Sequence, residues 1–234
     1  MQDFIHLHNH THYSILDAAC TPIQLIKAAK EAGHKALALT DHGVMFGCYE
    51  FYNKSRKEGI KPIIGYEAYV ANGSRFDKAV TQNGTKKKNY FHLVMLAKNE
   101  VGYKNLMKLT SLAHIEGYYY KPRIDEELIQ KYSEGIIVCS ACIVGVINAH
   151  LVRDDYPTAL EKAKFYQEVF GDDFYIELQN HSLPEDEIIL TQAPKIAKEL
   201  GIKIIATNDV HYIKKEHAIA HNVLLNIRKE ANPN

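Results

Sequence analysis

The sequence predicts an α/β fold in which about seven strand–helix units form a closed or distorted barrel. Four segments of the 234-residue chain repeat one pattern, in which a helix-like stretch ends at a glycine and a short run rich in Ile, Val, Leu and Ala follows. The glycines are Gly33, Gly59, Gly135 and Gly201. Glycine terminates helices because it adopts a left-handed backbone readily, and continuous apolar runs of roughly four to eight residues are typical of buried parallel strands.

Predicted helices separate these strands along the chain. Besides the four runs that follow the glycines, strands are expected at 3–8, 91–97 and 173–179. The expected helices span 21–32, 46–58, 99–114, 154–170, 186–200 and 214–228. The total of about seven βα units favours a closed or distorted barrel over an open sheet.

Polar side chains follow several of the predicted strands at the point where each strand ends. They are Asp41, His42, Glu67, Cys142, Asp209 and His211. In βα barrels the chemistry lies at the carboxyl ends of the strands, on the loops that lead into the next helix. The positions therefore predict that these side chains gather at one mouth.

The first expected strand carries histidine at every second position, in the segment "HLHNHTHYSILD". Side chains alternate between the two faces of an extended chain, so His6, His8, His10 and His12 are predicted to project from one face. His8 and His10 can then reach a common ion, although a pair of histidines two residues apart is a weak motif by itself.

A metal centre becomes the better interpretation once the other strand ends are included. Isolated buried charges are unfavourable, and they gather mainly where they are paired or bind metal. The candidate ligands from this argument are His8, His10, Asp17, His42, Glu67, Asp209 and His211. A mixed nitrogen and oxygen set of this size suits Zn, Mn or Fe, and several ions rather than one.

Two further motifs leave alternatives open. Cys139 and Cys142 form a CxxC motif at a strand-to-helix turn, which is typical either of a thiol redox pair or, as we favour, of a thiolate ligand from Cys142 beside a core Cys139. His181 follows a predicted strand and is a candidate for orienting a ligand or transferring a proton. The pair His217 and His221 is interpreted as structural, since no third ligand is evident.

Composition limits the class of protein. Lys and Arg number 28 and Asp and Glu number 28, so no global charge favours nucleic acid or a membrane surface. We find no signal peptide and no apolar run of about 18 residues, and four unevenly spaced cysteines fit a reducing compartment. We therefore expect a cytoplasmic protein with one globular domain at 1–228, a polar insertion at 71–90 and a tail at 229–234.

Six motifs in order resemble a known family. They are "LHNHTHYSILD", "ALTDHG", "GYEAYV", "FHLVMLAKNEVGYKNLMKL", "GYYYKPRID" and "ATNDVHY". Together they resemble the polymerase and histidinol phosphatase (PHP) domain, and in particular the branch of that family at the N-terminus of bacterial DNA polymerase III alpha subunits. The resemblance covers essentially the whole chain and implies a distorted (βα)7 barrel with up to three divalent metal ions at its mouth.

The resemblance also implies how the ligands are shared. One ion would be held by His8, His10, Glu67 and Asp209, a second by Glu67, His92 and Cys142, and a third by Asp17, His42 and His211. His92 enters only through the resemblance, because it precedes rather than follows its apolar run. His6 is kept as a neighbour of the ligands rather than a ligand.

The activity that the resemblance implies is metal-dependent phosphoester hydrolysis, including 3′ to 5′ exonuclease proofreading on a DNA primer end. Asp209, His211 and Glu67 are the expected catalytic residues, and Lys121, Arg123, Tyr119 and His181 the expected substrate contacts. The expected partners are DNA, the remaining domains of a polymerase alpha subunit, toward which 229–234 would lead, and the replisome. The chain by itself is not expected to polymerise nucleotides.

Two other interpretations stay open. The barrel can be a catalytically inert domain that its metals brace and that stabilises the polymerase, because metal binding contributes folding free energy directly. It can also be a free-standing phosphatase of small molecules such as histidinol phosphate, a possibility that the formal net charge of +0 favours.

Overall fold

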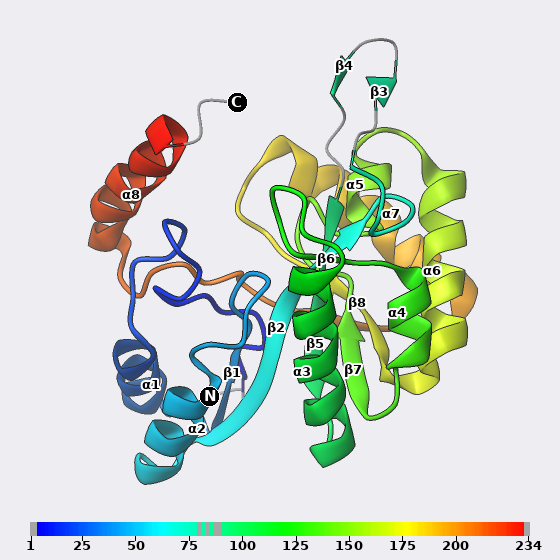
Figure 1. The fold of residues 1–234 in the computed structure, drawn as a ribbon. Helices are drawn as coiled ribbons and strands as arrows, with labels where there is room; N and C mark the ends of the chain where they lie inside the picture. The colour runs from blue at the N-terminus through cyan, green and yellow to red at the C-terminus, as the bar shows by residue number, and fades with distance from the viewer. Residues whose placement is uncertain (1–3, 79–80, 83–84, 87–89, 232–234) are drawn as a thin grey trace. The chain divides into compact units, whose positions relative to one another are not determined.

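Two compact units make up the part of the chain that the computed structural model describes, which is residues 4–78, 81–82, 85–86 and 90–231 (Figure 1). Unit 1 comprises Met1–Tyr66 together with Asn208–Asn234, and unit 2 comprises Glu67–Thr207. Among the described residues no helix is long and apolar enough to cross a membrane.

Unit 1 is built from helices around one parallel strand pair. Its elements are α1 (Pro22–Glu31), β1 (Ala36–Leu39), α2 (Cys48–Lys57), the first part of β2 (Lys61–Ala71), the 3-10 turn η2 (Lys215–His217) and α8 (Ala218–Ala231). β1 pairs in parallel with β2, with Ala36 opposite Lys61. The loop and helix between them provide the crossover that a parallel pair needs.

Local signals in the sequence explain where α1 begins. Thr21 accepts a hydrogen bond from the backbone N–H of Gln24, and the Gln24 side chain accepts one from the Thr21 backbone N–H. This capping box satisfies two backbone donors at the helix start, and Pro22 supplies a preset backbone angle for the first turn. The apolar face of α1 packs on a core formed by Leu25, Ile26, Ala29, Leu37, Leu39, Cys48, Phe51 and Ile60.

The histidine-rich segment of unit 1 is extended but forms no regular strand over its described residues 4–8, so the predicted strand at 3–8 is wrong as an element. Instead the segment forms a few backbone hydrogen bonds with the β1 region on one side and with Val210 on the other. His6 and Asn9 accept through their backbone oxygens from Ala38 and Thr40 of the β1 region. On the other side Val210 donates to the His8 oxygen and accepts from the His10 N–H. These bonds are too widely spaced for a continuous ladder, yet they fix the alternation of side chains.

Unit 2 holds the remaining strands and helices. Its strands are the rest of β2, β3 (Thr81–Gln82), β4 (Thr85–Lys86), β5 (Tyr90–Ala97), β6 (Arg123–Ile124), β7 (Ile136–Cys139), β8 (Phe174–Leu178) and β9 (Lys203–Ala206). Its helices are α3 (Glu100–Ile115), α4 (Glu126–Lys131), α5 (Asn148–Leu151), α6 (Tyr156–Phe170), η1 (Gly171–Asp173) and α7 (Pro184–Leu200). The short β6, α4 and α5 were not predicted, because elements of two to six residues leave little periodic signal.

The expected α/β alternation is confirmed, with one difference in strand direction. β6 pairs in parallel with β2, and β8 pairs in parallel with both β7 and β9. β5 and β7, however, are antiparallel, with Val94 opposite Cys139. The chain reaches β5 through the polar insertion, where β3 and β4 form an antiparallel hairpin, rather than through a crossover helix. Residues 79–80, 83–84 and 87–89 of that insertion lie outside the described part.

All four glycines that the sequence marks adopt a left-handed backbone. Their φ angles are 80° at Gly33, 75° at Gly59, 72° at Gly135 and 68° at Gly201. Gly135 serves a second purpose, because it lies so close to Gly102 of α3 that a Cβ built on Gly102 would stand 1.7 Å from the Gly135 oxygen. The start of α3 therefore packs against the turn before β7 through backbone alone.

Candidate metal centres

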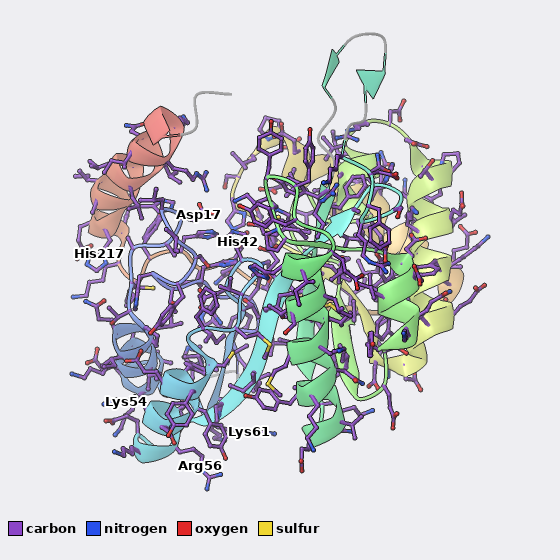
Figure 2. The ribbon with its side chains drawn as sticks, viewed as in Figure 1. Asp17, His42, Lys54, Arg56, Lys61 and His217 are labelled. Carbon is purple, nitrogen blue, oxygen red and sulfur yellow. The ribbon has the colours of Figure 1, made fainter. Side chains whose placement is uncertain are left out.

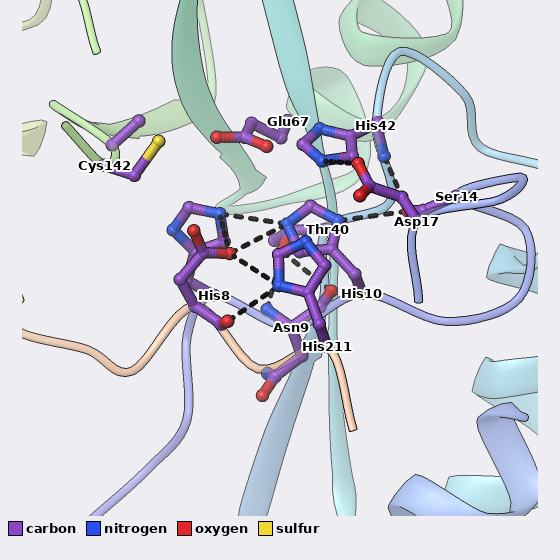
Figure 3. A network of polar contacts seen from close by, with 12 residues as sticks. His8, Asn9, His10, Ser14, Asp17, Thr40, His42, Glu67, Cys142 and His211 are labelled. Atoms are coloured by element: carbon purple, nitrogen blue, oxygen red, sulfur yellow. Dashed lines mark hydrogen bonds and ion pairs between the residues drawn. The ribbon is translucent and has the colours of Figure 1, made fainter. Parts of the chain in front are cut away.

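Three buried donor atoms of unit 1 converge from two segments far apart in the chain. His8 Nε2 and His10 Nε2 lie 3.1 Å apart, and each lies 3.2 Å from Asp209 Oδ1 (Figure 3). Both histidines are fully buried, whereas 16% of the Asp209 side chain is exposed. Ligands about 2.0–2.2 Å from a tetrahedral Zn ion stand roughly 3.3–3.6 Å apart, so the three atoms need only a small expansion to share one ion.

The hydrogen bonds around His10 support metal binding rather than simple packing. The Ser14 hydroxyl donates a hydrogen bond to Asp41 at 2.8 Å, so its oxygen, 3.0 Å from His10 Nδ1, accepts a hydrogen bond from the N–H at that position. His10 Nε2 then carries no hydrogen, and its lone pair faces His8 Nε2 and a carboxylate oxygen. A cation between these atoms would accept all three lone pairs, and the donor atoms fit a divalent metal ion.

Burial and neighbouring charges keep these groups in the form that binds metal. Burial, together with His42 and His211, lowers the pKa of His10 to about 3, so its imidazole is neutral near pH 7. Burial alone would raise the pKa of Asp209, but His8, His10 and His211 hold that pKa well below its ordinary value. A neutral imidazole and an ionised carboxylate are the ligand forms that divalent metals require.

A second group in unit 1 adjoins the first through His10. The His10 ring stacks on those of His42 and His211, with centroids 4.1 and 4.4 Å away, and nitrogens of the three rings lie within 4.8 Å of one another. His42 Nε2 lies 3.0 Å from Asp17 Oδ2. The structure thus brings together the three residues predicted for one ion, Asp17, His42 and His211, and joins them to His10 (Figure 3).

Helix α8 contacts Asp17 in a way that the sequence did not reveal. Arg228 Nη1 lies 2.5 Å from Asp17 Oδ1, and His221 Nε2 donates to the Asp17 backbone oxygen at 2.7 Å. Burial alone would raise the pKa of Asp17, but the hydrogen bond from His42 and the charges of His42, His211 and Arg228 lower it to about 2. His221 therefore has a specific structural role, because it supports the loop that carries the predicted ligand Asp17.

Asp41 is the main supporting residue of unit 1. Its buried carboxylate accepts from the Thr11 N–H at 2.6 Å, from the Thr11 hydroxyl and from the Ser14 hydroxyl. Through Ser14 it fixes the tautomer of His10, and partners of this kind orient the ligands of metal sites. The sequence flagged Asp41 as a strand-end acid but not in this role.

Unit 2 contains a cluster of three predicted ligands. His92 Nδ1 lies 3.0 Å from Glu67 Oε1 and 3.8 Å from Cys142 Sγ. Glu67 is buried, whereas His92 and Cys142 are partly exposed. A carboxylate, an imidazole and a thiol within this distance could hold a Zn ion.

The direction of β5 explains why the search at strand ends missed His92. Because β5 runs antiparallel to β7, its beginning lies beside the carboxyl end of β7. The His92 backbone donates to the Val144 oxygen and its oxygen accepts from Val146, so it is tied to the loop that carries Cys142. A signal for this reversal exists in the sequence, since no helix pattern precedes residues 91–97.

Glu177 supports the loop of Cys142 through hydrogen bonds. Its buried carboxylate accepts from the Ala141 N–H at 3.2 Å, from the Gln179 amide at 2.9 Å and from the Thr207 hydroxyl. Cys139 of the same motif is buried in β7, where burial and then Glu177 raise the pKa of its thiol. A buried thiol of raised pKa argues against the redox pair and agrees with the core role predicted for Cys139.

Three predicted ligands lie at strained turns of the backbone. Asp209 has a φ of 47°, Leu16 before Asp17 has 58°, and Ala141 before Cys142 has 63°. Left-handed backbone at a non-glycine residue costs about 1–3 kcal/mol and gathers at functional sites. The turns that aim these ligands are therefore maintained against local strain.

Several other predicted residues lie outside these clusters. His6 packs its ring against Phe4 and His34, and His12 packs against Tyr13, so neither joins the donor groups of His8 and His10. The expectation that all four histidines share one face is wrong for His12. The chain bends out of its extended course after His10, because His12 bonds to the Cys20 oxygen.

The predicted substrate contacts lie in unit 2. Arg123 is fully buried, and its guanidinium donates to the backbone oxygens of Gly117, Asp77 and Arg75. These bonds argue against its predicted role as a phosphate clamp. Its neighbours are placed differently, since Lys121 Nζ lies 5.2 Å from the centroid of the Tyr69 ring and the Tyr119 ring lies beside Arg123 and Tyr120. The His181 N–H donates to Asp186 at the start of α7.

A family model described as the PHP domain matches residues 6–181. The chain belongs to the PHP domain family. The predicted family is thus confirmed, and the match includes the histidine-rich segment and the loop of Cys142 but ends before Asp209 and His211.

Two curated relatives extend the PHP match, both named DNA polymerase III subunit alpha. The one from Aquifex aeolicus is 48% identical over 227 residues, which is 96% of this chain and 20% of the relative. The one from Borreliella burgdorferi is 46% identical over 222 residues, which is 95% of this chain and 19% of the relative. The PHP chain thus spans about a fifth of the length of the curated relatives it matches.

A solved structure shares the PHP fold. It is a two-domain protein from Bacteroides vulgatus that contains a predicted PHP-like metal-dependent phosphoesterase. The TM-score is 0.52 at 16% identity, over 89% of this chain and 52% of that protein. This likeness supports the fold class that the sequence predicts.

Proposed function

We propose that this PHP domain is a metal-dependent phosphoesterase within a bacterial DNA polymerase III alpha subunit, and that it removes nucleotides from the 3′ end of a DNA primer. The observation that carries the proposal is the convergence of His8, His10 and Asp209, whose donor atoms lie 3.1–3.2 Å apart. Similarity to named polymerase subunits supports the choice of DNA as substrate, with the other polymerase domains and the replisome as partners.

The residues divide the work between holding metal and holding protons. His8, His10 and Asp209 would hold one ion, and Asp17, His42 and His211 would hold another. Glu67, His92 and Cys142 would hold the third. Bound divalent ions, Zn, Mn or Fe, would activate water and stabilise charge on the phosphoester oxygens. His211 holds its proton at Nδ1, which lies 2.9 Å from the Asp209 backbone oxygen, and this leaves its Nε2 as the atom that would bind metal.

The test is nucleotide release from a primer with a mismatched 3′ end, measured with added Mn or Zn. Asp209→Asn should lower the rate at least about 100-fold, because even the outer partners of metal ligands contribute roughly 10–100-fold. Asp172→Asn is the matched control, since Asp172 is exposed and pairs only with Lys203 among the described ion pairs. Equal release by wild type and Asp209→Asn would refute the proposal.

A metal-braced domain without turnover is the second candidate, and one observation favours it. The six predicted ligands of unit 1 come from three segments, 8–17, 42 and 209–211, so bound ions would cross-link distant parts of the chain. This alternative expects bound metal and a raised unfolding temperature, but no release of nucleotides or of phosphate from small esters. Hydrolysis of small phosphomonoesters with no action on DNA would instead favour a free-standing phosphatase.

A further inference from the structure

Helix α2 of unit 1 exposes aromatic rings that contribute nothing to its core. Tyr49 is 81% exposed and Tyr52 is 46% exposed, and they stand three residues apart, so they are neighbours on the helix surface. Phe46, just before the helix, is 65% exposed. Single exposed rings are common on protein surfaces, but three within seven residues of one segment form an aromatic stripe, which we define as Phe46, Tyr49 and Tyr52.

Positively charged side chains follow the aromatic stripe along α2. Arg56 follows Tyr52 by one helical turn, and its guanidinium lies 6.0 Å from the centroid of the Tyr52 ring. The other exposed cations nearby are Lys54, Lys57 and Lys61. Within the described part of the chain none of these four cations forms an ion pair, because Glu58 pairs with Lys30 and Glu50 accepts from the Tyr13 hydroxyl. Cations in the last turn also suit the helix dipole, but that effect does not explain the exposed rings.

The stripe begins beside the predicted metal ligands. His42 precedes Phe46 by four residues, so their Cα atoms are at most about 14 Å apart, the reach of an extended chain of that length. In Figure 2, which labels His42, Lys54 and Arg56 of this unit, His42 lies near the middle of the view and Arg56 toward the bottom. A path along α2 therefore leads from the predicted metal centre over the rings to the cations.

We propose that this stripe is a stacking platform for single-stranded DNA, which holds the strand whose 3′ end reaches the metal centre. Unpaired bases stack on exposed aromatic rings in proteins that bind single strands, and cations beside the rings follow the phosphates. At about 3.4 Å per stacked nucleotide, the base over Phe46 lies roughly four nucleotides or fewer from the strand end. The inference rests on the function proposed above and names the surface that selects an unpaired end.

The experiment measures binding of a fluorescent oligothymidylate of about 12 nucleotides by anisotropy in EDTA, so that no hydrolysis is required. Tyr49→Ala combined with Tyr52→Ala should weaken binding about tenfold or more, since each base stacked on a ring contributes that much. Tyr49→Phe, which keeps the ring and removes the hydroxyl, should retain wild-type affinity. Tyr103→Ala on α3 is the matched control, because Tyr103 is a partly exposed helical tyrosine of unit 2.

Salt dependence separates the cations from the rings. Arg56→Ala should reduce the slope of the logarithm of affinity against the logarithm of salt by about 0.7, the value for one phosphate contact on a single strand. The ring variants should lower affinity without changing that slope. Circular dichroism and thermal unfolding establish that each variant is folded.

Three outcomes would overturn the platform. They are equal oligothymidylate affinity for wild type and the double tyrosine variant, equal losses from Tyr103→Ala, and a variant that binds DNA normally but no longer associates with the rest of a polymerase subunit. The last outcome would identify a protein-docking surface instead. Binding in EDTA and nucleotide release by Asp209→Asn are independent measurements, so failure of the platform and failure of the proposed function are distinguishable.

Discussion

The predicted ligand clusters of the two units differ in chemistry and in spacing. Unit 1 offers imidazoles and carboxylates, and three of its donor atoms lie within 3.2 Å of one another. Unit 2 offers one carboxylate, one imidazole and one thiol, and its sulfur lies 3.8 Å from His92 Nδ1. The nitrogen and oxygen cluster is therefore the more tightly assembled, while the thiol makes the second cluster the softer one.

The supporting carboxylates differ in the same way. Asp41 reaches a ligand ring, because Ser14 links it to His10. Glu177 accepts from the backbone of the Cys142 loop, through the Ala141 N–H, and from the side chains of Gln179 and Thr207. Asp41 therefore fixes the protonation state of a ligand, whereas these bonds of Glu177 fix the course of a loop.

Removal of the two supporting carboxylates should give the largest effects. Asp41→Ala and Glu177→Ala each leave several buried donors without acceptors, so each should lower the free energy of unfolding by about 3–5 kcal/mol. Denaturant unfolding of the metal-free proteins measures this loss. Conservative Asp41→Asn should also lower metal affinity roughly 10–100-fold through His10, whereas Glu177→Gln should leave it nearly unchanged. Equal affinities for both conservative variants would remove the distinction between the units.

Metal binding should stabilise the protein by a comparable amount. At a free metal concentration about 1,000 times the dissociation constant, binding adds roughly 4 kcal/mol to the free energy of unfolding. We expect EDTA to lower the unfolding temperature and Zn or Mn to restore it. Asp209→Asn should lose most of this response and Asp172→Asn none of it, as measured by calorimetry beside elemental analysis. An unfolding temperature insensitive to EDTA would contradict a metal centre in either unit.

Acid should destabilise the metal-free protein through His10. Because its folded pKa is lowered to about 3, the unfolded chain takes up a proton below about pH 6.5 that the folded protein does not. Stability is therefore lost as the pH falls from about 6.5 toward 3, by about 2 kcal/mol at pH 5. Denaturant midpoints across this range measure the effect, and His10→Gln should flatten the profile. A profile unchanged by that substitution would assign the acid sensitivity to other groups.

The smallest expected effect concerns metal preference in unit 2. Cys142→Ser replaces a soft sulfur by a hard oxygen, so the preference for Zn over Mn should fall by about tenfold at that cluster alone. Titration of each metal into the variant, with Cys48→Ser as the control for a buried core cysteine, tests this. An equal change from both substitutions would indicate a structural rather than a coordinating role.

The sequence predicted best those features that local chemistry determines. Helix α1 was expected at 21–32 and spans Pro22–Glu31, because Thr21, Pro22 and Gly33 mark its ends by themselves. The same holds for α6 and α7, each of which begins at or beside a proline. His42 and Cys142 were predicted likewise, since each follows a parallel strand, whereas Glu67 was expected at a strand end and lies inside β2.

Features that depend on distant contacts could not be predicted in this way. The reversed direction of β5 follows from its pairing with β7, in which Val94 lies opposite Cys139, 45 residues further along the chain. The missing helix pattern before residues 91–97 is a signal of the reversal, but it does not indicate which strand β5 pairs with. Arg123 resembles an exposed clamp in the motif "YYKPRID", but the backbone of 75–77 supplies the acceptors that bury it. The bend after His10 depends similarly on Cys20.

The backbone at Asp209 restricts this position twice. Glycine would relax its left-handed turn at φ 47° but has no oxygen to offer, whereas glutamate keeps a carboxylate on a residue that tolerates this turn poorly. Asparagine adopts the turn as readily as aspartate but remains uncharged. Aspartate therefore suits this position both by its backbone angle and by its charge. The substitution to asparagine keeps the first and removes the second, so it tests the charge alone.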